Sequence, residues 1–318
     1  MEALEDLLRA MRLSGAVFLD AEFTAPWCII AKMGADDCRA FMPVPGHLIA
    51  YHYIVEGQLS LRIDDEPRCD AVAGELLVLP RNDAHVLGND LDLRPRAAND
   101  LIEPATGDGL ARIRYGGGGT RCRILCGFLG TDDRTDPLIA SLPPVLKVSL
   151  KTGRMGSWIE ASMRYAAREL AAGGPGAASS QARLSEVLFA EAVRKYVESL
   201  PPRCKGWLAG LRDPYVGRAL AMIHSRATHP WTLHELAREV GLSRSALGER
   251  FARHIGMSPM RYHSRRRLQY AADRLRHSKA PVSQIAYEIG YESDAAFSRS
   301  FKREFGASPA AFRELDHR

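Results

Sequence analysis

The sequence predicts an α+β protein with a β-rich N-terminal domain and an all-helical C-terminal domain. Residues 27–130 contain short runs rich in β-branched and aromatic residues, separated by Gly, Pro, Asn and Asp. From residue 215 onward the apolar residues recur at helical spacing instead. At 318 residues the chain is also long enough to bury two separate cores.

The composition is typical of a soluble globular protein. The chain is 46% hydrophobic and 25% charged, and no apolar run approaches the roughly 18 residues that a membrane span needs. The first twenty residues carry acidic side chains where a signal peptide carries basic ones. We therefore expect a cytoplasmic protein with no membrane contact.

The charge of the chain is unevenly distributed. Residues 212–318 contain 19 Lys and Arg against 11 Asp and Glu, which is a net charge of +8. Because the whole chain carries +5, a net charge of −3 is left for residues 1–211. A local basic excess indicates that the C-terminal domain meets a polyanion, whereas the N-terminal domain has another role.

The predicted strands of the N-terminal domain lie between about residues 20 and 130. They are WCIIAKM (27–33), LIAYHYIVEGQLSLRID (48–64), GELLVLP (74–80) and RCRILCGFLG (121–130). Predicted loops cover residues 92–109 and the glycine run 116–119. Short strands at this spacing favour a small β-sandwich or barrel.

Residues 155–200 change to a helical period. One expected helix carries Trp158, Ile159, Met163 and Leu170, and a second carries Leu184, Val187, Leu188, Glu191, Tyr196 and Leu200. The second stripe either packs on its own domain or forms a homodimer interface. A boundary follows near residues 201–214, so we predict two domains, 1–205 and 212–318.

The C-terminal domain contains an internal duplication. Five apolar or glycine positions recur 49 residues later and seven more recur 50 residues later. Each unit has a short helix, a glycine that can end it, and a second helix that begins at Ser or Asp. The duplication therefore predicts two helix-turn-helix units, whose second helices bury the stripes Leu247, Phe251, Ile255 and Phe297, Phe301, Phe305.

A long helix is predicted between the two units. It begins with Ser258 as N-cap and Pro259 at the first helical position, and it runs without Gly or Pro to Ser278. About 18 residues span roughly 27 Å, which approaches the ~34 Å between successive major-groove segments. Near its start lies a basic cluster that contacts phosphate or forms a solvated helix face: Arg261, Arg265, Arg266 and Arg267.

Residues 215–315, and above all IAYEIGYESDAAFSRSFKREFGASPAAFR, resemble the AraC/XylS family of transcriptional regulators. The resemblance implies double-stranded DNA and RNA polymerase as partners. It implies base contacts by the exposed faces of the two second helices, namely Arg244, Ser245, Gly248 and Glu249, then Asp294, Ala295, Ser298 and Arg299, with Lys302 beside them. Gly248 offers no side chain and Glu249 is acidic, so the first helix is expected either to read the sequence weakly or to depend on a neighbour such as Arg250. Arg299 is the strongest candidate, because its forked guanidinium suits a guanine edge.

Residues 74–89, GELLVLPRNDAHVLGN, resemble the second cupin motif, with Gly74, Pro80, His85 and Asn89 in place. Upstream, HYIVE (52–56) matches only part of the first cupin motif, because Ala50 replaces its first histidine. Strand alternation would place His52 and Glu56 on one face. The order of parts resembles the cupin-bearing subgroup of the same regulators.

Three interpretations of this cupin-like domain stay open. His52, Glu56 and His85 form a divalent metal site, or they line an effector pocket with Trp27 and Tyr51. Alternatively, oxidation of Cys28, Cys122 or Cys126 supplies a redox signal. No cofactor is required for the second or third interpretation.

Together these observations predict a sequence-specific DNA-binding transcription regulator, not an enzyme, whose N-terminal domain senses a small molecule or a redox change. One alternative is a metal-dependent cupin oxygenase fused to a DNA-binding domain. Another is a DNA-binding regulator that has no effector.

Overall fold

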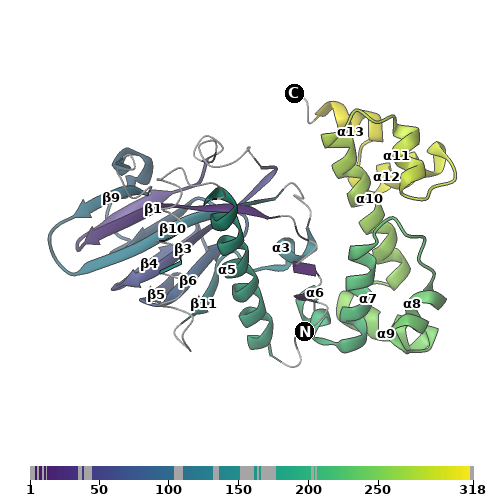
Figure 1. Cartoon of the computed structure of the whole chain (residues 1–318), viewed down its shortest axis with the longest axis horizontal. Coiled ribbons are helices and arrows are strands. Elements are labelled where there is room, and N and C mark those ends of the chain that lie inside the picture. Colours follow the sequence, from purple (N-terminus) through teal and green to yellow (C-terminus); the bar gives the residue numbers. More distant parts are fainter. Residues whose placement is uncertain are drawn as a thin grey trace. The chain divides into compact units, whose positions relative to one another are not determined.

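The computed structural model describes residues 13–34, 45–103, 110–131, 136–150, 177–201 and 206–315, with residues 4, 5, 7, 8, 11, 38, 161, 162, 165 and 204. The chain forms two compact units, one of Arg12–Ser199 and one of Leu200–Arg318 with Met1–Met11 (Figure 1). The predicted helix around Trp158 and Met163 lies outside the described residues. An α+β fold is confirmed, with the strands in the first unit and helices throughout Trp207–Leu315 of the second.

The first unit contains a six-stranded and a five-stranded sheet. The six-stranded sheet has the order β11-β6-β3-β10-β1-β9 and the smaller one β5-β4-β7-β2-β8. The larger sheet comprises β1 (Ser14–Thr24), β3 (His47–Glu56), β6 (Glu75–Leu79), β9 (Ala111–Gly116), β10 (Arg121–Thr131) and β11 (Leu146–Ser149). The smaller comprises β2 (Cys28–Ala31), β4 (Gln58–Arg62), β5 (Cys69–Val72), β7 (His85–Gly88) and β8 (Arg96–Ala97).

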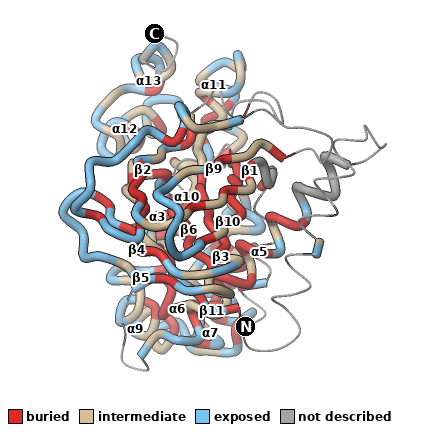
Figure 2. Tube along the Cα trace, turned by 90° about the vertical axis from the view of Figure 1, so that its left-hand side faces the viewer, coloured by how far each residue is buried: buried red, intermediate tan, exposed pale blue. Residues whose placement is uncertain are grey.

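Side chains from both sheets form one hydrophobic core. Ala50 and Ile54 of β3 and Ile124 of β10 belong to this core together with Ile29 of β2 and Leu87 of β7. These positions alternate along their strands with residues of the opposite face, as the period of two requires. Figure 2 shows burial concentrated in these strands.

The segment between β10 and the predicted helices contains both a helix and a strand. The run DPLIASLPPVLKV forms the short helix α3 (Pro137–Ser141) and then β11, which pairs antiparallel with β6. Pro143 and Pro144 follow the helix and prevent its continuation. Leu146 and Val148 are buried while Lys147 is exposed, so β11 covers the edge of β6 with one apolar face.

Helix α5 (Ala177–Ser199) packs on the six-stranded sheet, where it contacts β1, β10 and β11. Its stripe Leu188, Phe189, Ala192 and Val193 is fully buried. Tyr51 of β3 projects from the same face of the sheet, and its hydroxyl lies 3.2 Å from the Ser185 hydroxyl. Of the predicted stripe, Leu184, Leu188 and Glu191 thus pack on their own domain, whereas Val187 is exposed.

The second unit is a sequence of helices. They are α6 (Trp207–Arg212), α7 (Pro214–Ser225), α8 (Leu233–Val240), α9 (Arg244–Ile255), α10 (Pro259–His277), α11 (Val282–Glu288), α12 (Asp294–Phe305) and α13 (Pro309–Leu315). Figure 1 shows α7 to α9 gathered at one end of α10 and α11 to α13 at the other. The predicted linker helix is confirmed, with Ser258 as N-cap and Pro259 in the first turn.

Candidate nucleic-acid interface and barrel pocket

The first helix-turn-helix consists of α8 and α9. Thr232 and Glu235 form a capping box at the start of α8, and Gly241 ends the helix in the left-handed conformation, with φ of 78°. Ser243 then caps α9 by accepting a hydrogen bond from the Ala246 amide. Leu247 and Phe251 on one side of α9 are fully buried, so its other side faces solvent.

The second helix-turn-helix repeats this construction with α11 and α12. Gly290 has φ of 76°, close to that of Gly241, and Ser293 caps α12 through the Ala296 amide. Phe297 and Phe301 are fully buried at the positions of Leu247 and Phe251. The duplication in the sequence is therefore a duplication of structure, and α9 and α12 are the two candidate recognition helices.

The exposed faces of α9 and α12 carry the side chains that the sequence predicted for DNA contact. On α9, Arg244, Ser245 and Glu249 are exposed and Gly248 is open, because a Cβ there would have nothing within 4 Å. On α12, Asp294, Ala295, Arg299 and Lys302 are exposed and Ser298 is half-buried. Each face is thus open to solvent.

Arg250 differs from these predicted contacts. Its Nε lies 2.6 Å from Oδ2 of Asp213, and its guanidinium lies 4.9 Å from the centre of the Tyr215 ring. Asp213 is also the N-cap of α7, where Oδ1 accepts from the Tyr215 and Val216 amides. Burial alone would raise the pKa of Asp213, but these bonds and Arg250 together hold it below its usual value. Arg250 is therefore engaged inside the unit.

The predicted phosphate cluster on α10 is also partly engaged. The Nε of Arg265 lies 2.8 Å from Oε1 of Glu304 on α12. The Nε of Arg267 donates to the Ile289 carbonyl, and its guanidinium lies 4.8 Å from the centre of the Tyr291 ring. Arg267 thereby satisfies a carbonyl at the end of α11, and burial lowers its pKa. Arg261 is exposed and stays a candidate for phosphate contact.

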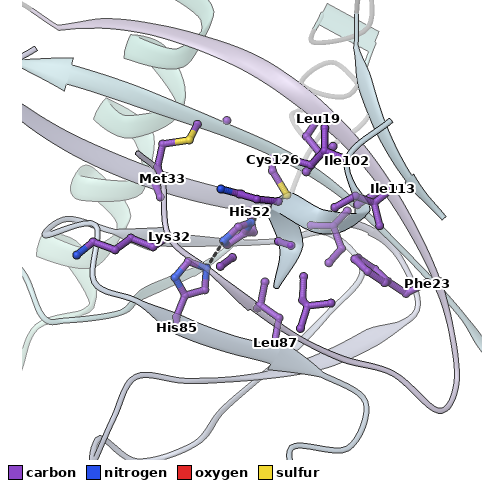
Figure 3. A pocket seen from close by; sticks show the side chains of 18 residues that line it. Leu19, Phe23, Lys32, Met33, His52, His85, Leu87, Ile102, Ile113 and Cys126 are labelled. Atoms are coloured by element: carbon purple, nitrogen blue, oxygen red, sulfur yellow. Dashed lines mark hydrogen bonds between the residues drawn. The ribbon is translucent and has the colours of Figure 1, made fainter. Parts of the chain in front are cut away.

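An apolar pocket lies in the first unit between residues of both sheets (Figure 3). Its cavity volume, measured as the space open to the centres of water-sized molecules, is about 50 Å³. Most of its walls are aliphatic or aromatic side chains, such as Phe23, Leu87 and Ile113. His52 and His85, both predicted for the sensor site, line it together with Cys126.

These three side chains form one hydrogen-bonded chain. His85 Nδ1 lies 2.9 Å from the Asp83 carbonyl, and the two histidine Nε2 atoms are 2.8 Å apart. His52 Nδ1 lies 3.0 Å from the Cys126 sulfur. A carbonyl only accepts, so His85 Nδ1 donates and its Nε2 accepts from His52 Nε2. The bare Nδ1 of His52 then accepts from the Cys126 thiol.

Burial keeps every member of this chain uncharged. It lowers the pKa of His52 well below its usual value, with a further contribution from His85. Burial also lowers the pKa of His85, although the Asp83 carbonyl opposes this effect. The pKa of Cys126 is raised by burial as well. At neutral pH the chain is thus two imidazoles and a thiol.

Glu56 does not join these histidines, which corrects the predicted metal site. Ile54 pairs with Ile124 and Glu56 with Arg123, so Val55 is an extra residue in β3 that reverses the alternation. The Glu56 side chain is 53% exposed and lies 3.9 Å from Arg121. No group of three metal-ligating side chains occurs among the residues that the structure describes. A cupin-type metal centre does not fit these residues.

Four other predicted sensor residues also lie away from the histidines. Tyr51 faces α5, and Trp27 and Cys122 line a separate polar hollow with Arg68, Asp70 and Arg121. Cys28 is buried, but it alternates with Ile29 and Ala31, which line the apolar pocket. Cys122 and Cys126 share the core-facing side of β10. Burial raises the pKa of Cys28, and it raises the pKa of Cys122 to about 12, so neither thiol is activated.

The sequence did not reveal the role of α6, which it placed at a domain boundary. The Trp207 indole donates to the Tyr262 hydroxyl at 2.6 Å, and that hydroxyl lies 2.7 Å from Nε2 of His224. The only local indication was Asp213 before Pro214, a pair typical of a helix start. Nothing in the sequence indicated that α6 contacts α9.

Comparison with known proteins supports both parts of this description. A family model described as "Cupin" matches residues 2–198, and one described as "Helix-turn-helix domain" matches residues 236–315. An AraC-like transcription regulator of Streptomyces antibioticus is 29% identical over 99% of each chain. The HTH-type transcriptional regulator AlkR of Acinetobacter baylyi is 27% identical over 99% of each chain.

Among solved structures, the DNA-binding domain of AdpA in complex with a target DNA matches 32% of the chain and 91% of that domain. The two are 26% identical and the TM-score is 0.31. No helix in the described part of the chain is long and apolar enough to cross a membrane. With a cupin model covering most of the first unit and full-length AraC-like relatives, the chain belongs to the AraC family of DNA-binding transcription regulators with an N-terminal cupin domain.

Proposed function

We propose that α9 and α12 each read one segment of major groove in a single operator. The observation that carries this proposal is the repetition of one capped helix-turn-helix at both ends of α10. A helix of 19 residues spans about 28 Å, close to the ~34 Å between successive turns of the groove. The net charge of +8 in residues 212–318 favours a polyanion further.

The side chains assigned to base contact are those on the two exposed faces. We assign Arg244, Ser245, Gly248 and Glu249 to the first segment, and Asp294, Ala295, Ser298, Arg299 and Lys302 to the second. A glycine and an acid on α9 offer few donors, whereas Arg299 on α12 can form a bidentate contact with guanine. The second segment therefore contributes more to sequence specificity than the first.

The barrel pocket is proposed to bind a small-molecule effector that shifts the equilibrium between DNA-binding arrangements. Its support is a largely apolar hollow with a few polar groups, a form common to ligand sites. A redox signal receives less support, because burial raises the pKa of all three candidate thiols and thus keeps them protonated. The proposal needs no cofactor.

The relatives' names describe transcription regulators, so we propose RNA polymerase as a partner and the cytoplasm as the place of action. We also propose a homodimer, although the buried stripe of α5 packs on its own sheet. Light scattering of the full chain with and without DNA measures the number of copies.

A gel-shift titration of the full chain tests DNA binding. Fragments from upstream of its own gene and its neighbours are titrated at several salt concentrations. We expect a complex with one or a few fragments whose affinity falls steeply with salt. Equal binding to all fragments, or binding to none, would overturn the proposed function.

A further inference from the structure

Among the residues that the structure describes, the inner end of the apolar pocket offers no spare hydrogen-bonding side chain. In the chain from Cys126 to Asp83, the thiol proton, the single N–H of each neutral imidazole and both bare ring nitrogens are already used. The remaining inner walls are apolar, with Phe23, Ile113 and Ile124 among them. The histidines that look like ligand-binding groups in the sequence are therefore saturated.

The polar side chains outside this chain lie at the surface. Lys32 and Asn99 line the pocket but are exposed to solvent. Figure 3 shows the Lys32 side chain directed away from the two histidines. A charged group placed in the inner pocket would lose its hydration without gaining a partner.

On the basis of the proposed effector function, we infer that this pocket binds a small uncharged molecule whose buried part has no hydrogen-bonding group. Burial of apolar surface supplies the affinity. The hydrogen-bonded chain stays closed on binding, so neither histidine gains or loses a proton.

Three probes of similar ring size test this inference: methylcyclohexane, cyclohexanol and cyclohexanecarboxylate. Each is added at matched concentrations to the full chain, and the rise in unfolding temperature of the N-terminal unit is measured. We expect methylcyclohexane to bind at least about tenfold more tightly than the alcohol, because the alcohol leaves its hydroxyl unpaired. The carboxylate is expected to give no shift.

A second measurement follows the histidines directly by ¹⁵N NMR of histidine-labelled protein. We expect His85 protonated on Nδ1 and His52 on Nε2, with no change when methylcyclohexane binds. For a control on one strand, Ala31→Phe fills the pocket and should abolish the shift, whereas Ile30→Phe points to the other face and should not.

Tighter binding of the alcohol or the carboxylate would overturn the inference, as would no shift with any probe. Operator binding in the gel shift is measured separately. Failure of the probes with intact DNA binding therefore removes the ligand class and leaves the DNA-binding part of the proposed function standing.

A different observation concerns the segment Gly206–Asp213, which we name the α6 clamp. The Gly206 amide donates to the His254 carbonyl near the end of α9 at 3.0 Å. A Cβ at Gly210 would lie 2.7 Å from Cδ1 of Ile255, so α6 packs at Gly210 against the tip of that α9 side chain. The carboxylate of Asp213 lies 2.6 Å from Arg250 and 3.6 Å from His254.

The α6 clamp contacts the side of α9 that faces away from the predicted base contacts. At 3.6 residues per turn, Arg250 and His254 lie on the side of α9 opposite its four predicted base-contact positions. The clamp also directly follows the sensor unit in the chain, since seven residues, 200–206, separate α5 from α6. The second helix-turn-helix has no counterpart of α6, because α10 is joined to α11 only by Ser278–Pro281.

The geometry points to Asp213 and Arg250 as positioning residues for α9 in its reading of the first DNA segment. Asp213→Asn separates the two roles of this residue, because Oδ1 still caps α7 while the ion pair with Arg250 is lost. We expect about a tenfold loss of operator affinity from the first segment only.

Hydroxyl-radical footprinting of the full chain tests this assignment, with Arg244→Ala and Arg299→Ala marking the two segments. Asp213→Asn and Gly210→Ala should both weaken protection of the segment marked by Arg244→Ala. The matched control Glu288→Gln breaks the ion pair between α11 of the second helix-turn-helix and Arg274 of α10. It should leave protection of the segment marked by Arg244→Ala unchanged.

A merely structural role would reduce protection of both segments together with the unfolding temperature, and that result would overturn the assignment. Unchanged footprints for both clamp variants would overturn it as well. If the unmodified chain gave no footprint, the proposed DNA reading itself would fail.

Discussion

The two helix-turn-helix units share a backbone but are stabilised by different neighbours. Around α9, Tyr262 packs edge-on against Phe251 and receives the hydrogen bond of Trp207 from the α6 clamp. Around α12, Phe301 lies within 5.4 Å, 4.6 Å and 5.3 Å of the rings of Phe297, Phe305 and Phe312. The first helix-turn-helix depends on a polar network and the second helix-turn-helix on an aromatic cluster.

This difference shows that a few shared residues are enough for both repeats to adopt the same fold. The shared features are a serine cap, a left-handed glycine and two buried positions on the recognition helix. These fix the turn and the packing of two helices. The outer faces and the supporting neighbours are free to differ, which allows the two units distinct DNA contacts and distinct control.

The largest expected effect comes from truncating the buried phenylalanines. Phe251→Ala and Phe301→Ala should each lower the free energy of unfolding of the helical unit by about 3–5 kcal/mol. The loss should be greater for Phe301, because its three ring contacts add about 0.5–1.5 kcal/mol each in pairs of this kind. Urea unfolding followed by circular dichroism measures both.

Tyr287→Ala is the control for this pair, because Tyr287 is 82% exposed and should change stability by less than about 0.5 kcal/mol. Equal losses for Phe251 and Phe301 would contradict the distinction between a polar and an aromatic support.

Lowering the pH should destabilise the first helix-turn-helix more than the second. Burial lowers the pKa of His224 well below its usual value and that of His263 to about 4, and both belong to the support of the first unit. Residues 278–315 contain no histidine. As pH falls below about 6.5, the unfolded chain takes up protons that the folded chain does not. Stability should therefore fall by up to about 1.4 kcal/mol per pH unit for each histidine.

Hydrogen exchange between pH 6.5 and 4.5, corrected for intrinsic rates, measures this effect by peptide. Peptides of α7 to α9 should lose protection while those of α11 to α13 keep theirs. Parallel loss in both sets of peptides would show that the units unfold together.

DNA affinity gives the third comparison. Arg299→Ala should weaken operator binding by about 1–3 kcal/mol, because a long cation at a base edge or a phosphate is lost. Glu249→Ala on α9 should leave affinity unchanged or raise it, since an acid near phosphates repels them. Gel-shift titrations measure both, with Arg94→Ala in the β-sheet domain as the control. A greater loss for Glu249→Ala than for Arg299→Ala would reverse the assigned order of the two segments.

The smallest effect tests what the units share. Ser243→Ala and Ser293→Ala should each cost about 1 kcal/mol of stability, and by similar amounts, because each hydroxyl accepts from an amide at 3.2 Å. Thermal unfolding measures the pair. A substantial difference between the two would mean that the caps are not equivalent.

The barrel shows where sequence patterns stop being sufficient. Strand alternation predicted His52 and Glu56 on one face, but Val55 is an extra residue opposite β10 and turns Glu56 outward. A bulge depends on the register with the partner strand, whose residues are about seventy positions away in the chain. The sequence of β3 alone does not contain that information.

The sequence by itself determined the two-domain α+β organisation, the duplicated helix-turn-helix and the linker helix with its ends. These features depend on residues close together in the chain: caps, glycines, prolines and an apolar period. Local preferences act before any distant contact is formed, so they can be read directly.

The tertiary structure alone decided which charged and polar side chains are already committed. Arg250 pairs with Asp213 across 37 residues, Arg267 satisfies a carbonyl 22 residues away, and His52 meets Cys126 across 74. The identity of an arginine or histidine in the sequence does not reveal its binding partner. Whether it reaches DNA, a ligand or its own fold is fixed by the neighbours that packing brings to it.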